Sequence, residues 1–507
     1  MKRFSISLKN VAAIAACFAA ITFTACDTTG GSEPDVPVAS VAIEPPSATA
    51  LSSLTAGGGT MTLAVKIEPA NASDKTVMWS SSNTAVATVN STGVVTGVSQ
   101  GKATITATTK SGSKTAEFEV EVKPDPKAQP VELKSPIREN TTLKDLGMDI
   151  DYFYAGNNQL VVENNATLTI EPGVTIRFSH TGKYGGMIIK AGATIKAVGS
   201  ASKRIKFIGT DNSKGSWAGI SVETNSDNQF AYCDFVNAGN VEGTVSGGMR
   251  VYNAKVGFSY CTITGGLGYG LYFGSDAVTR CELTAFDHNV IEGFDNYPPL
   301  FIYTTGGLKL LEKMDMTSDL TKNAKPYIEI RPDMMDPVTI NQASVPYYIR
   351  NTFWISYPLV INEGVTIYME SDIAGVQRNS TARLTVNGTA SKKVKFTRLP
   401  GSTKYWYYIN FNNRLNGCVI NHCIFEYGGA NPGNADDAII CITSDDVTVT
   451  EVTFNNVEIK NAQGYGAQIK GCNYIINHNN VTFSNNGSGN VNDRCPRPNA
   501  VIRPNFP

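Results

Sequence analysis

The sequence predicts an all-β protein of several domains, in which a small two-sheet sandwich precedes a duplicated array of short strands. Charged residues make up only 17% of the 507 residues, below the roughly 25% usual in soluble proteins. Short runs that alternate apolar and polar residues are separated by turn residues, among them many of the 46 glycines. One part of the chain also repeats the phrases of another. The formal charge of −1 leaves no electrostatic footprint for nucleic acid, so no nucleic-acid partner is expected.

The N-terminus has the pattern of an export signal. Lys2, Arg3 and Lys9 form a positive start, and residues 11–23 form an apolar stretch too short to span about 30 Å of hydrocarbon. The stretch ends in Phe23-Thr24-Ala25-Cys26, which resembles a bacterial lipobox, although Phe23 departs from the branched aliphatic residue usual at that position. An ordinary cleaved signal with an incidental cysteine is the alternative interpretation.

The lipobox resemblance implies that residues 1–25 are a lipoprotein signal peptide, cleaved before an acylated Cys26. Residues 26–37 are rich in Thr, Gly, Ser and Pro and are expected to form a flexible tether. Several acyl chains on one cysteine anchor a protein stably, whereas a single chain binds marginally. We therefore expect an exported protein that is anchored to the outer membrane or cell surface through its lipid.

Residues 38–123 alternate with a period of two and are interrupted by turn residues, as is typical of a β-sandwich. Gly93 and Gly101 are expected at positive φ in turns, and Trp79 is interpreted as a core residue rather than a sugar platform. The segment resembles the bacterial immunoglobulin-like group 2 family, which implies a spacer or adhesive unit. The matching phrases lie at 69–72, 77–83, 86–89, 93–98 and 101–105.

A Pro-rich linker at residues 124–136 precedes two copies of one unit. The phrase Gly-Val-Thr-Ile at 173–176 recurs at 364–367, and the phrase at 199–207 recurs in similar form at 388–396. Trp217 recurs as Trp406, and the matches are colinear, which chance explains poorly. The predicted boundaries are 137–295 for copy one, 296–337 for a connecting seam, and 338–507 for copy two with a C-terminal tail.

The predicted strands span three to five residues and are too short to bury a face alone, so they must stack on one another. Their phrases resemble right-handed parallel β-helix proteins of the pectate-lyase-like superfamily, most closely the subset on surface lipoproteins of Bacteroidetes-type bacteria. The predicted fold class is thus an immunoglobulin-like β-sandwich followed by a duplicated right-handed parallel β-helix. We expect coils of about 20–25 residues, and one or two helical turns at 308–314. The expected inward ladder includes Ile170, Val174, Ile176, Ile188 and Ile195.

The ten cysteines do not indicate a disulfide framework. Cys17 belongs to the signal peptide and Cys26 to the lipid, and most of the other eight are interpreted as buried free thiols. Disulfides are the alternative, because an exported location permits them. Cys418 and Cys423 are five residues apart and are expected on opposite faces of a strand. The chain has no C-x-x-C motif or paired Cys/His cluster, so neither a metal site nor a cofactor is predicted.

Patterns that indicate catalysis are weak, and no catalytic residue is assigned. None of the four histidines lies in a nucleophile or ligand motif, and His422 and Cys423, as strand neighbours, should point to opposite faces. Lyases of the resembled superfamily hold calcium with clustered Asp, and its hydrolases pair Asp residues near a Gly-His-Gly phrase, which is absent here. Solvated turn residues are the preferred interpretation of the acidic pairs. If the protein is an enzyme, the candidates are Asp436, Asp437, Asp445 and Asp446.

Aromatic residues give a better indication of a binding site. Four rings follow one another from Tyr405 to Tyr408, and an extended backbone would expose alternate ones. Trp406 and Trp217 are interpreted as packing residues because both copies keep them. Tyr405 and Tyr407 have no counterpart in copy one and are the candidate ligand-binding residues, since exposed rings can stack on sugars.

Two main functions follow from this sequence. The first is a cell-surface lipoprotein that binds glycans or host surface polymers without catalysis, as an adhesion or recognition protein. The alternative is a polysaccharide lyase or glycoside hydrolase on a β-helix scaffold, since one fold hosts many activities. A purely structural role in the surface layer is a third. The enzyme requires carboxylates and a base that converge in one groove, whereas the binding protein requires only exposed rings and amides along a face.

Overall fold

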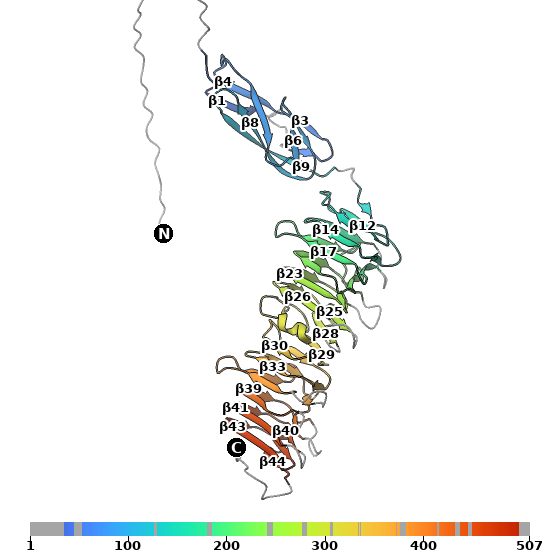
Figure 1. The fold of residues 1–507 in the computed structure, drawn as a ribbon, viewed down its shortest axis with the longest axis vertical. Helices are drawn as coiled ribbons and strands as arrows, with labels where there is room; N and C mark the ends of the chain where they lie inside the picture. The colour runs from blue at the N-terminus through green and yellow to red at the C-terminus, as the bar shows by residue number, and fades with distance from the viewer. Residues whose placement is uncertain are drawn as a thin grey trace, which may run out of the picture. The chain divides into compact units, whose positions relative to one another are not determined.

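The computed structural model describes residues 35–44, 53–125, 129–179, 185–240, 247–275, 281–304, 308–332, 334, 336–371, 373–375, 382–412, 415–430, 437–444 and 449–495. The chain forms two compact units, an N-terminal sandwich and a long parallel solenoid (Figure 1). The all-β prediction and the two predicted folds are confirmed. The lipobox and Cys26 lie outside the described residues.

The N-terminal unit is a sandwich of short, mostly antiparallel strands. One sheet has the order β2-β9-β8-β5, a second has the order β3-β7-β6, and β1 pairs with β4. β8 buries every second residue, including Ile105 and Ala107, because alternate side chains of a strand point to opposite faces. Gly93 and Gly101 have φ of 80° and 148°, as predicted. The strands are β1 Ser40–Glu44, β2 Ser53–Thr55, β3 Thr60–Thr62, β4 Ala64–Glu68, β5 Val77–Ser81, β6 Ala87–Val89, β7 Val94–Gly97, β8 Gly101–Thr109 and β9 Thr115–Lys123.

The second unit is a parallel β-helix, in which each strand pairs with its counterpart in the next coil. Two sheets are confined to the first half. One consists of β10 Val131–Glu132, β12 Tyr152–Tyr154, β15 Thr175–Phe178, β18 Ile205–Ile208, β21 Cys233–Val236, β24 Thr262–Thr264 and β27 Val290–Glu292. The other consists of β11 Thr141–Leu143, β14 Thr167–Ile170, β17 Thr194–Val198, β20 Asn228–Ala231, β23 Lys255–Ser259 and β26 Glu282–Asp287.

A long sheet runs through both halves, and a further sheet is confined to the second half. The long sheet begins with β13 Leu160–Val162, β16 Gly186–Ile189, β19 Gly219–Val222, β22 Gly247–Tyr252, β25 Tyr269–Ser275, β28 Leu300–Thr304 and β29 Ile328–Pro332. It continues with β31 Tyr347–Ile349, β34 Thr366–Met369, β37 Val394–Thr397, β39 Cys418–Glu426, β41 Thr450–Lys460 and β43 Tyr474–Ser484, and a branch from β39 contains β36 Leu384–Asn387, β33 Leu359–Asn362 and β30 Val338–Ile340. The further sheet consists of β32 Phe353–Ile355, β35 Ile373–Gly375, β38 Ile409–Asn412, β40 Ala438–Thr443, β42 Tyr465–Lys470 and β44 Gly489–Asp493.

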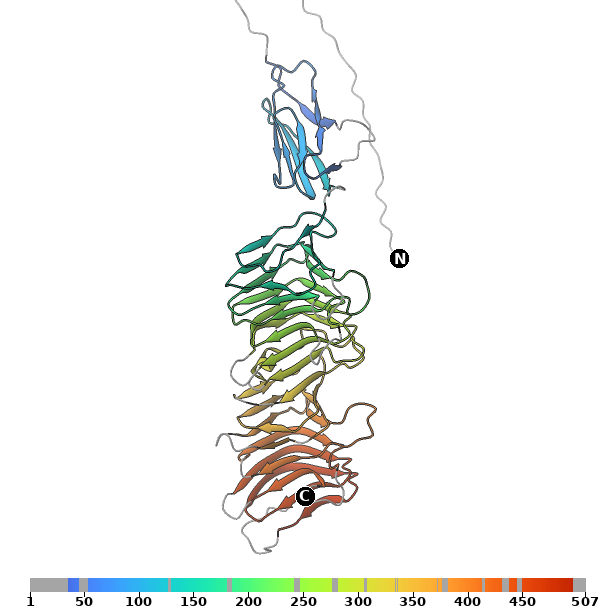
Figure 2. The same cartoon turned by 90° about the vertical axis from the view of Figure 1, so that its right-hand side faces the viewer.

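The two copies form one continuous stack of coils (Figure 2). Across the seam Leu300 pairs with Ile328, Ile328 with Tyr347 and Tyr347 with Ile367. The predicted helical turn is confirmed as a 3₁₀ helix, Leu308–Lys313, which buries three leucines. Equivalent strands of the two copies do not all belong to the same sheet. β34 is the sequence counterpart of β15, yet β34 belongs to the long sheet and β15 does not.

The inward ladders are aliphatic and aromatic, as expected for strands that stack coil on coil. Ile170, Val174, Ile176 and Ile195 are all buried as predicted, but Ile188 is half-exposed. The prediction for Ile188 was wrong because Met187 and Ile189 occupy the inward positions of that strand. The coils are also less even than the predicted period, since Met187 pairs with Ile220 whereas Ile328 pairs with Tyr347.

Single residues in the left-handed region turn the chain between two sheets. Tyr232, Tyr260 and His288 have φ of 51°, 55° and 52° at one corner of successive coils, and their rings stack at 4.7 and 4.5 Å. In the second half His422, with φ of 47°, occupies the same position within β39. Because of this extra residue, the alternation of buried and outward side chains starts again after His422.

Cys418 and Cys423 are therefore both fully buried, and the prediction that they lie on opposite faces was wrong. His422 itself is half-exposed beside the buried Cys423, as predicted. Six thiols are free and buried, which confirms the prediction for most of the cysteines: Cys233, Cys261, Cys281, Cys418, Cys423 and Cys441. Cys472 and Cys495 form a disulfide in the last described coil.

Candidate functional site

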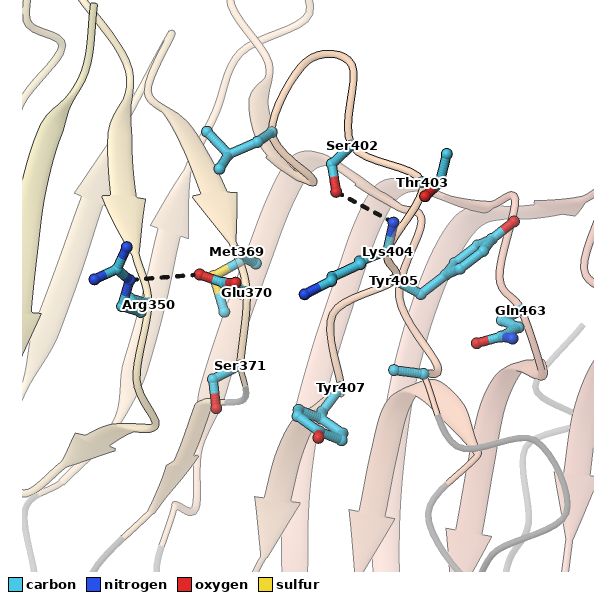
Figure 3. Close-up of a pocket in the computed structure, with 12 residues that line it drawn as sticks. Arg350, Met369, Glu370, Ser371, Ser402, Thr403, Lys404, Tyr405, Tyr407 and Gln463 are labelled. Carbon is cyan, nitrogen blue, oxygen red and sulfur yellow. Dashed lines mark hydrogen bonds and ion pairs between the residues drawn. The ribbon is translucent and has the colours of Figure 1, made fainter. Parts of the chain in front are cut away.

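A pocket of about 740 Å³ lies on the second half of the solenoid (Figure 3). Arg350 follows β31, and Glu370 and Ser371 follow β34, so neighbouring strands of the long sheet supply one wall. The connection between β37 and β38 supplies the opposite wall. The lining residues are Arg350, Met369, Glu370, Ser371, Leu399, Ser402, Thr403, Lys404, Tyr405, Tyr407, Ala430 and Gln463.

The wall formed by the long sheet carries an interacting group of charges. The Arg350 guanidinium lies between two carboxylates, with Nη1 3.9 Å from Glu329 Oε1 and Nε 3.7 Å from Glu370 Oε2. The Tyr348 hydroxyl donates to Glu370. Burial raises the pKa of the Glu329 carboxyl, which is only 7% exposed, and Arg350 partly offsets this effect. Glu370 therefore lines the pocket, whereas the buried Glu329 contacts Arg350 and does not line it.

The opposite wall carries the predicted tyrosines. Tyr405 is half-buried, Tyr407 is 41% exposed, and Trp406 between them is fully buried, because neighbouring residues of an extended segment point to opposite sides. The Arg398 guanidinium carbon lies 5.3 Å from the Tyr405 ring centroid, within cation–π range. Both candidate residues named from the sequence thus line one pocket. Lys404 points from the same wall towards Glu370 (Figure 3).

Backbone hydrogen bonds hold the tyrosine segment on both sides. The Tyr407 amide donates to the Ser371 carbonyl at 3.3 Å, and the Tyr407 carbonyl accepts from the Gly429 amide at 2.7 Å. The Trp406 amide donates to the Tyr427 carbonyl at 3.2 Å. The Ser402 hydroxyl accepts from the Lys404 amide at 3.1 Å. The pocket is therefore largely preformed, which lowers the entropic cost of binding a ligand.

Asp437 is the one acidic candidate that the structure describes, and it does not line this pocket. Asp437 is buried, 3% exposed, and its Oδ1 accepts from Gln468 Nε2 at 3.1 Å. Asp436, Asp445 and Asp446 lie outside the described residues. Among the residues that the structure describes, no three His, Cys, Asp or Glu side chains come together in a way that could hold a metal ion. In the same residues no helix is long and apolar enough to cross a membrane.

Arg350, Glu370 and Lys404 are pocket residues that sequence reasoning missed. Arg350 and Glu370 follow their strands at outward positions, and the pairing of Ile349 with Met369 brings the two side chains side by side. The outward alternation in Tyr-Tyr-Ile-Arg and Tyr-Met-Glu is a local signal for exposed charges. Their proximity is not readable from either phrase alone, because it depends on how the two strands pair.

The fold and pocket define a modular all-β protein, with an immunoglobulin-like domain and a parallel β-helix that carries a polar, tyrosine-lined pocket. Residues 37–120 match the family described as bacterial Ig-like domain (group 2), and residues 139–250 match the pectate-lyase like beta helix domain. The second match lies in the first half of the solenoid, and the pocket lies in the other half.

Two curated proteins of Bifidobacterium longum subsp. longum share short segments with this chain. One is an alpha-L-arabinofuranosidase, 50% identical over 62 residues, which are 12% of this chain. The other is a 3-O-alpha-D-galactosyl-alpha-L-arabinofuranosidase, 43% identical over 74 residues, which are 14% of this chain. The matched part spans about 6% of the length of each of these relatives.

Proposed function

We propose that this protein is a lipid-anchored cell-surface protein that binds glycans without catalysis, and that the pocket between Arg350 and Tyr407 is its binding site. The observation that carries the proposal is the pair of tyrosines, Tyr405 and Tyr407, facing charged and hydroxyl side chains across one preformed pocket. Copy one has no tyrosine at either position.

The chemistry of the pocket suits a sugar. Tyrosine rings offer apolar area for the faces of a pyranose or furanose at low entropic cost, because the side chain has two χ angles. Arg350 and Lys404 donate hydrogen bonds, Glu370 accepts them, and Ser371 and Ser402 do both. A ring face surrounded by hydroxyl groups is complementary to that combination.

The short relatives favour one glycan class as the first ligand to test. Both are described as arabinofuranosidases, one of which acts on a galactosylated arabinofuranose. The shared segments are too short to transfer an activity, but the names of both relatives refer to arabinofuranose. Arabinan and arabinogalactan are therefore the first candidates.

Binding of immobilised arabinan, arabinogalactan and a wider glycan panel tests the proposal. We expect wild-type protein to bind at least one glycan of the panel, and Tyr407→Ala to weaken that binding about tenfold, from the loss of one stacked ring. The matched control is Tyr260→Ala, which removes an exposed ring outside the pocket. If no glycan binds, or if both variants lose binding equally, the proposal is wrong.

Glycoside hydrolysis remains the alternative because Glu370 places a carboxylate in the pocket, with the Glu329 carboxyl on the other side of Arg350. Assays for new reducing ends and for unsaturated products, on each glycan that binds, separate the two functions. Turnover by wild-type protein that is lost in Glu370→Gln would replace the binding proposal with the enzymatic one.

A further inference from the structure

The long sheet carries two parallel rows of outward side chains that approach the pocket from the first half of the solenoid. In each strand of this sheet, one residue points into the core and the next points outward. The inner row is Arg250, Tyr272, Phe301, Glu329, Tyr348 and Tyr368, each paired with the next across neighbouring strands. The outer row begins with Tyr252, Gly274, Tyr303 and Arg331, which are paired in the same way.

The outer row continues into the pocket across the seam between the copies. Ile330 pairs with Ile349, and Ile349 pairs with Met369. The residues that follow these three are Arg331, Arg350 and Glu370, so they continue the outer row in that order. Arg350 and Glu370 line the pocket. The row from Tyr252 to Glu370 crosses five strand spacings, roughly 24 Å at about 4.8 Å for each.

The inner row is covered by rings from the starts of strands, since Tyr269 is the first residue of β25 and Tyr327 directly precedes β29. The Tyr269 ring stacks on Phe301 with centroids 4.7 Å apart, and the Tyr327 ring lies 4.9 Å from that of Tyr348. Tyr272 and Tyr348 are 5% and 2% exposed as a result. The inner row thus forms a packed base in which Tyr272 and Tyr348 are not available to a ligand, whereas Arg250, Phe301 and Tyr368 are half-exposed.

The outer row is open to solvent on both sides of Gly274, which is itself buried. Tyr252 is 40% exposed and Tyr303 38%, and the Arg350 side chain is 63% exposed. Arg331 is also exposed, and its guanidinium carbon lies 5.0 Å from the Tyr303 ring centroid. The Tyr303 ring in turn stacks beside Phe301 at 6.3 Å, so the packed base supports the exposed ring.

Gly274 leaves room for the tyrosine rings within the outer row. A Cβ at this position would lie 2.6 Å from Tyr272 Cε1 and 2.9 Å from Tyr252 Cδ2. The rings of both tyrosines therefore lie over the glycine backbone. Any larger residue would displace them, so the glycine allows the Tyr252 ring of the outer row to pack beside the Tyr272 ring of the inner row.

We propose that this outer row is a second binding subsite, and that the ligand is an extended glycan chain that lies along the solenoid axis. One end of the chain occupies the pocket, and the rest continues over Arg350, Arg331 and Tyr303 to Tyr252. The proposal rests on the proposed function and adds to it the class of ligand, a linear polymer or long oligosaccharide rather than a single sugar. Contacts along one chain act with a high effective concentration, so affinity rises with chain length.

The test measures binding of linear arabino-oligosaccharides, a disaccharide and an octasaccharide, beside fragments of the same two lengths from any other glycan that binds in the panel. We expect wild-type protein to bind the longer chain more tightly. Tyr303→Ala and Arg331→Gln should each weaken binding of the longer chain about two- to tenfold and leave the disaccharide unchanged. Tyr407→Ala should weaken binding of both lengths, and Tyr260→Ala neither.

The outcomes separate this inference from the proposed function. Glycan binding that depends on Tyr407 but not on chain length, or that Tyr303→Ala leaves unchanged for both lengths, overturns the second subsite alone. The absence of binding to any glycan of the panel overturns the site and the subsite together. Thermal unfolding of each variant identifies any that fail to fold, and the exposed positions of Tyr303 and Arg331 make two independent variants available.

Discussion

Trp217 and Trp406 make the same hydrogen bond in the two halves of the solenoid. Trp217 Nε1 donates to the Val236 carbonyl and Trp406 Nε1 to the Glu426 carbonyl, both at 2.9 Å. Both indoles are fully buried. The duplication thus extends from the repeated phrases to one shared hydrogen bond, although its acceptors lie in β21 and β39, which belong to different sheets of the solenoid.

This pair gives a matched test of how the pocket is supported. Replacing either tryptophan with phenylalanine removes a buried hydrogen bond and some volume, so we expect each variant to lose about 1–3 kcal/mol of unfolding free energy. Only Trp406 lies between Tyr405 and Tyr407. Trp406→Phe should therefore weaken glycan binding, whereas Trp217→Phe should leave it unchanged. Urea unfolding and glycan-binding measurements on the two variants check this prediction. If both variants bind glycan equally well, the buried Trp406 side chain does not position the pocket.

The repeated phrases were enough to predict the solenoid, because stacked coils require inward apolar residues and turn residues at regular places. They could not predict where alternation is reset. His422 adopts φ of 47° inside β39, and this one residue places Cys418 and Cys423 on the same side. Ile188 was misplaced for a related reason, since three consecutive apolar residues at 187–189 leave the inward face undefined.

The pocket was partly predictable. Tyr405 and Tyr407 were found because their phrase differs between the copies, which is a signal within one sequence. Arg350 and Glu370 come together only through the pairing of β31 with β34, and sequence alone does not give the register between strands. The outer row could not be predicted either, because it exists only where one sheet continues across the seam from the first copy into the second.

Glu329 should make the stability of the protein depend on pH. Burial raises the pKa of this carboxyl in the folded protein, so the folded chain keeps the proton longer than the unfolded chain. Its contribution to the unfolding free energy is therefore full below the usual pKa of 4.5 and is lost as pH rises through the folded pKa. Glu329→Gln cannot titrate, so the variant should gain stability relative to wild type as pH rises above that value.

Glu363 is the control with the opposite sign. Hydrogen bonds from Lys392 and Thr389 lower the pKa of this carboxyl, so its contribution is present above the unfolded pKa and is lost as pH falls. Glu363→Gln should therefore lose stability relative to wild type as pH rises. Urea unfolding from about pH 2.5 to about pH 8 measures both differences, because the Glu363 contribution is lost only below the usual pKa of 4.5. The same sign for both variants would contradict the assignment.

The cysteines should divide into two chemical groups. Burial raises the pKa of the Cys281 thiol to about 11 and that of Cys418 to about 12, so neither forms a reactive thiolate near neutral pH. In a chain with Cys17→Ser and Cys26→Ser, we expect a thiol reagent to label nothing in the native oxidised protein. Reduction should expose two thiols, Cys472 and Cys495. It should also lower the free energy of unfolding of the coil that this disulfide closes by about 3 kcal/mol. Labelling of any thiol before reduction, or of more than two after it, would contradict the buried assignment.

The proposed lipid anchor is tested by replacing Cys26, the residue that the lipobox resemblance marks for acylation. Cys26→Ser should move the protein from the membrane fraction to the soluble fraction, because no acyl chain can then be attached, and mass spectrometry should show no lipid at residue 26. Cys17→Ser is the matched control, since this cysteine lies within the apolar stretch of the signal and should leave fractionation unchanged. If Cys26→Ser stays in the membrane fraction while Cys17→Ser behaves like wild type, Cys26 is incidental. The protein is then held at the membrane by something other than acylation of this residue.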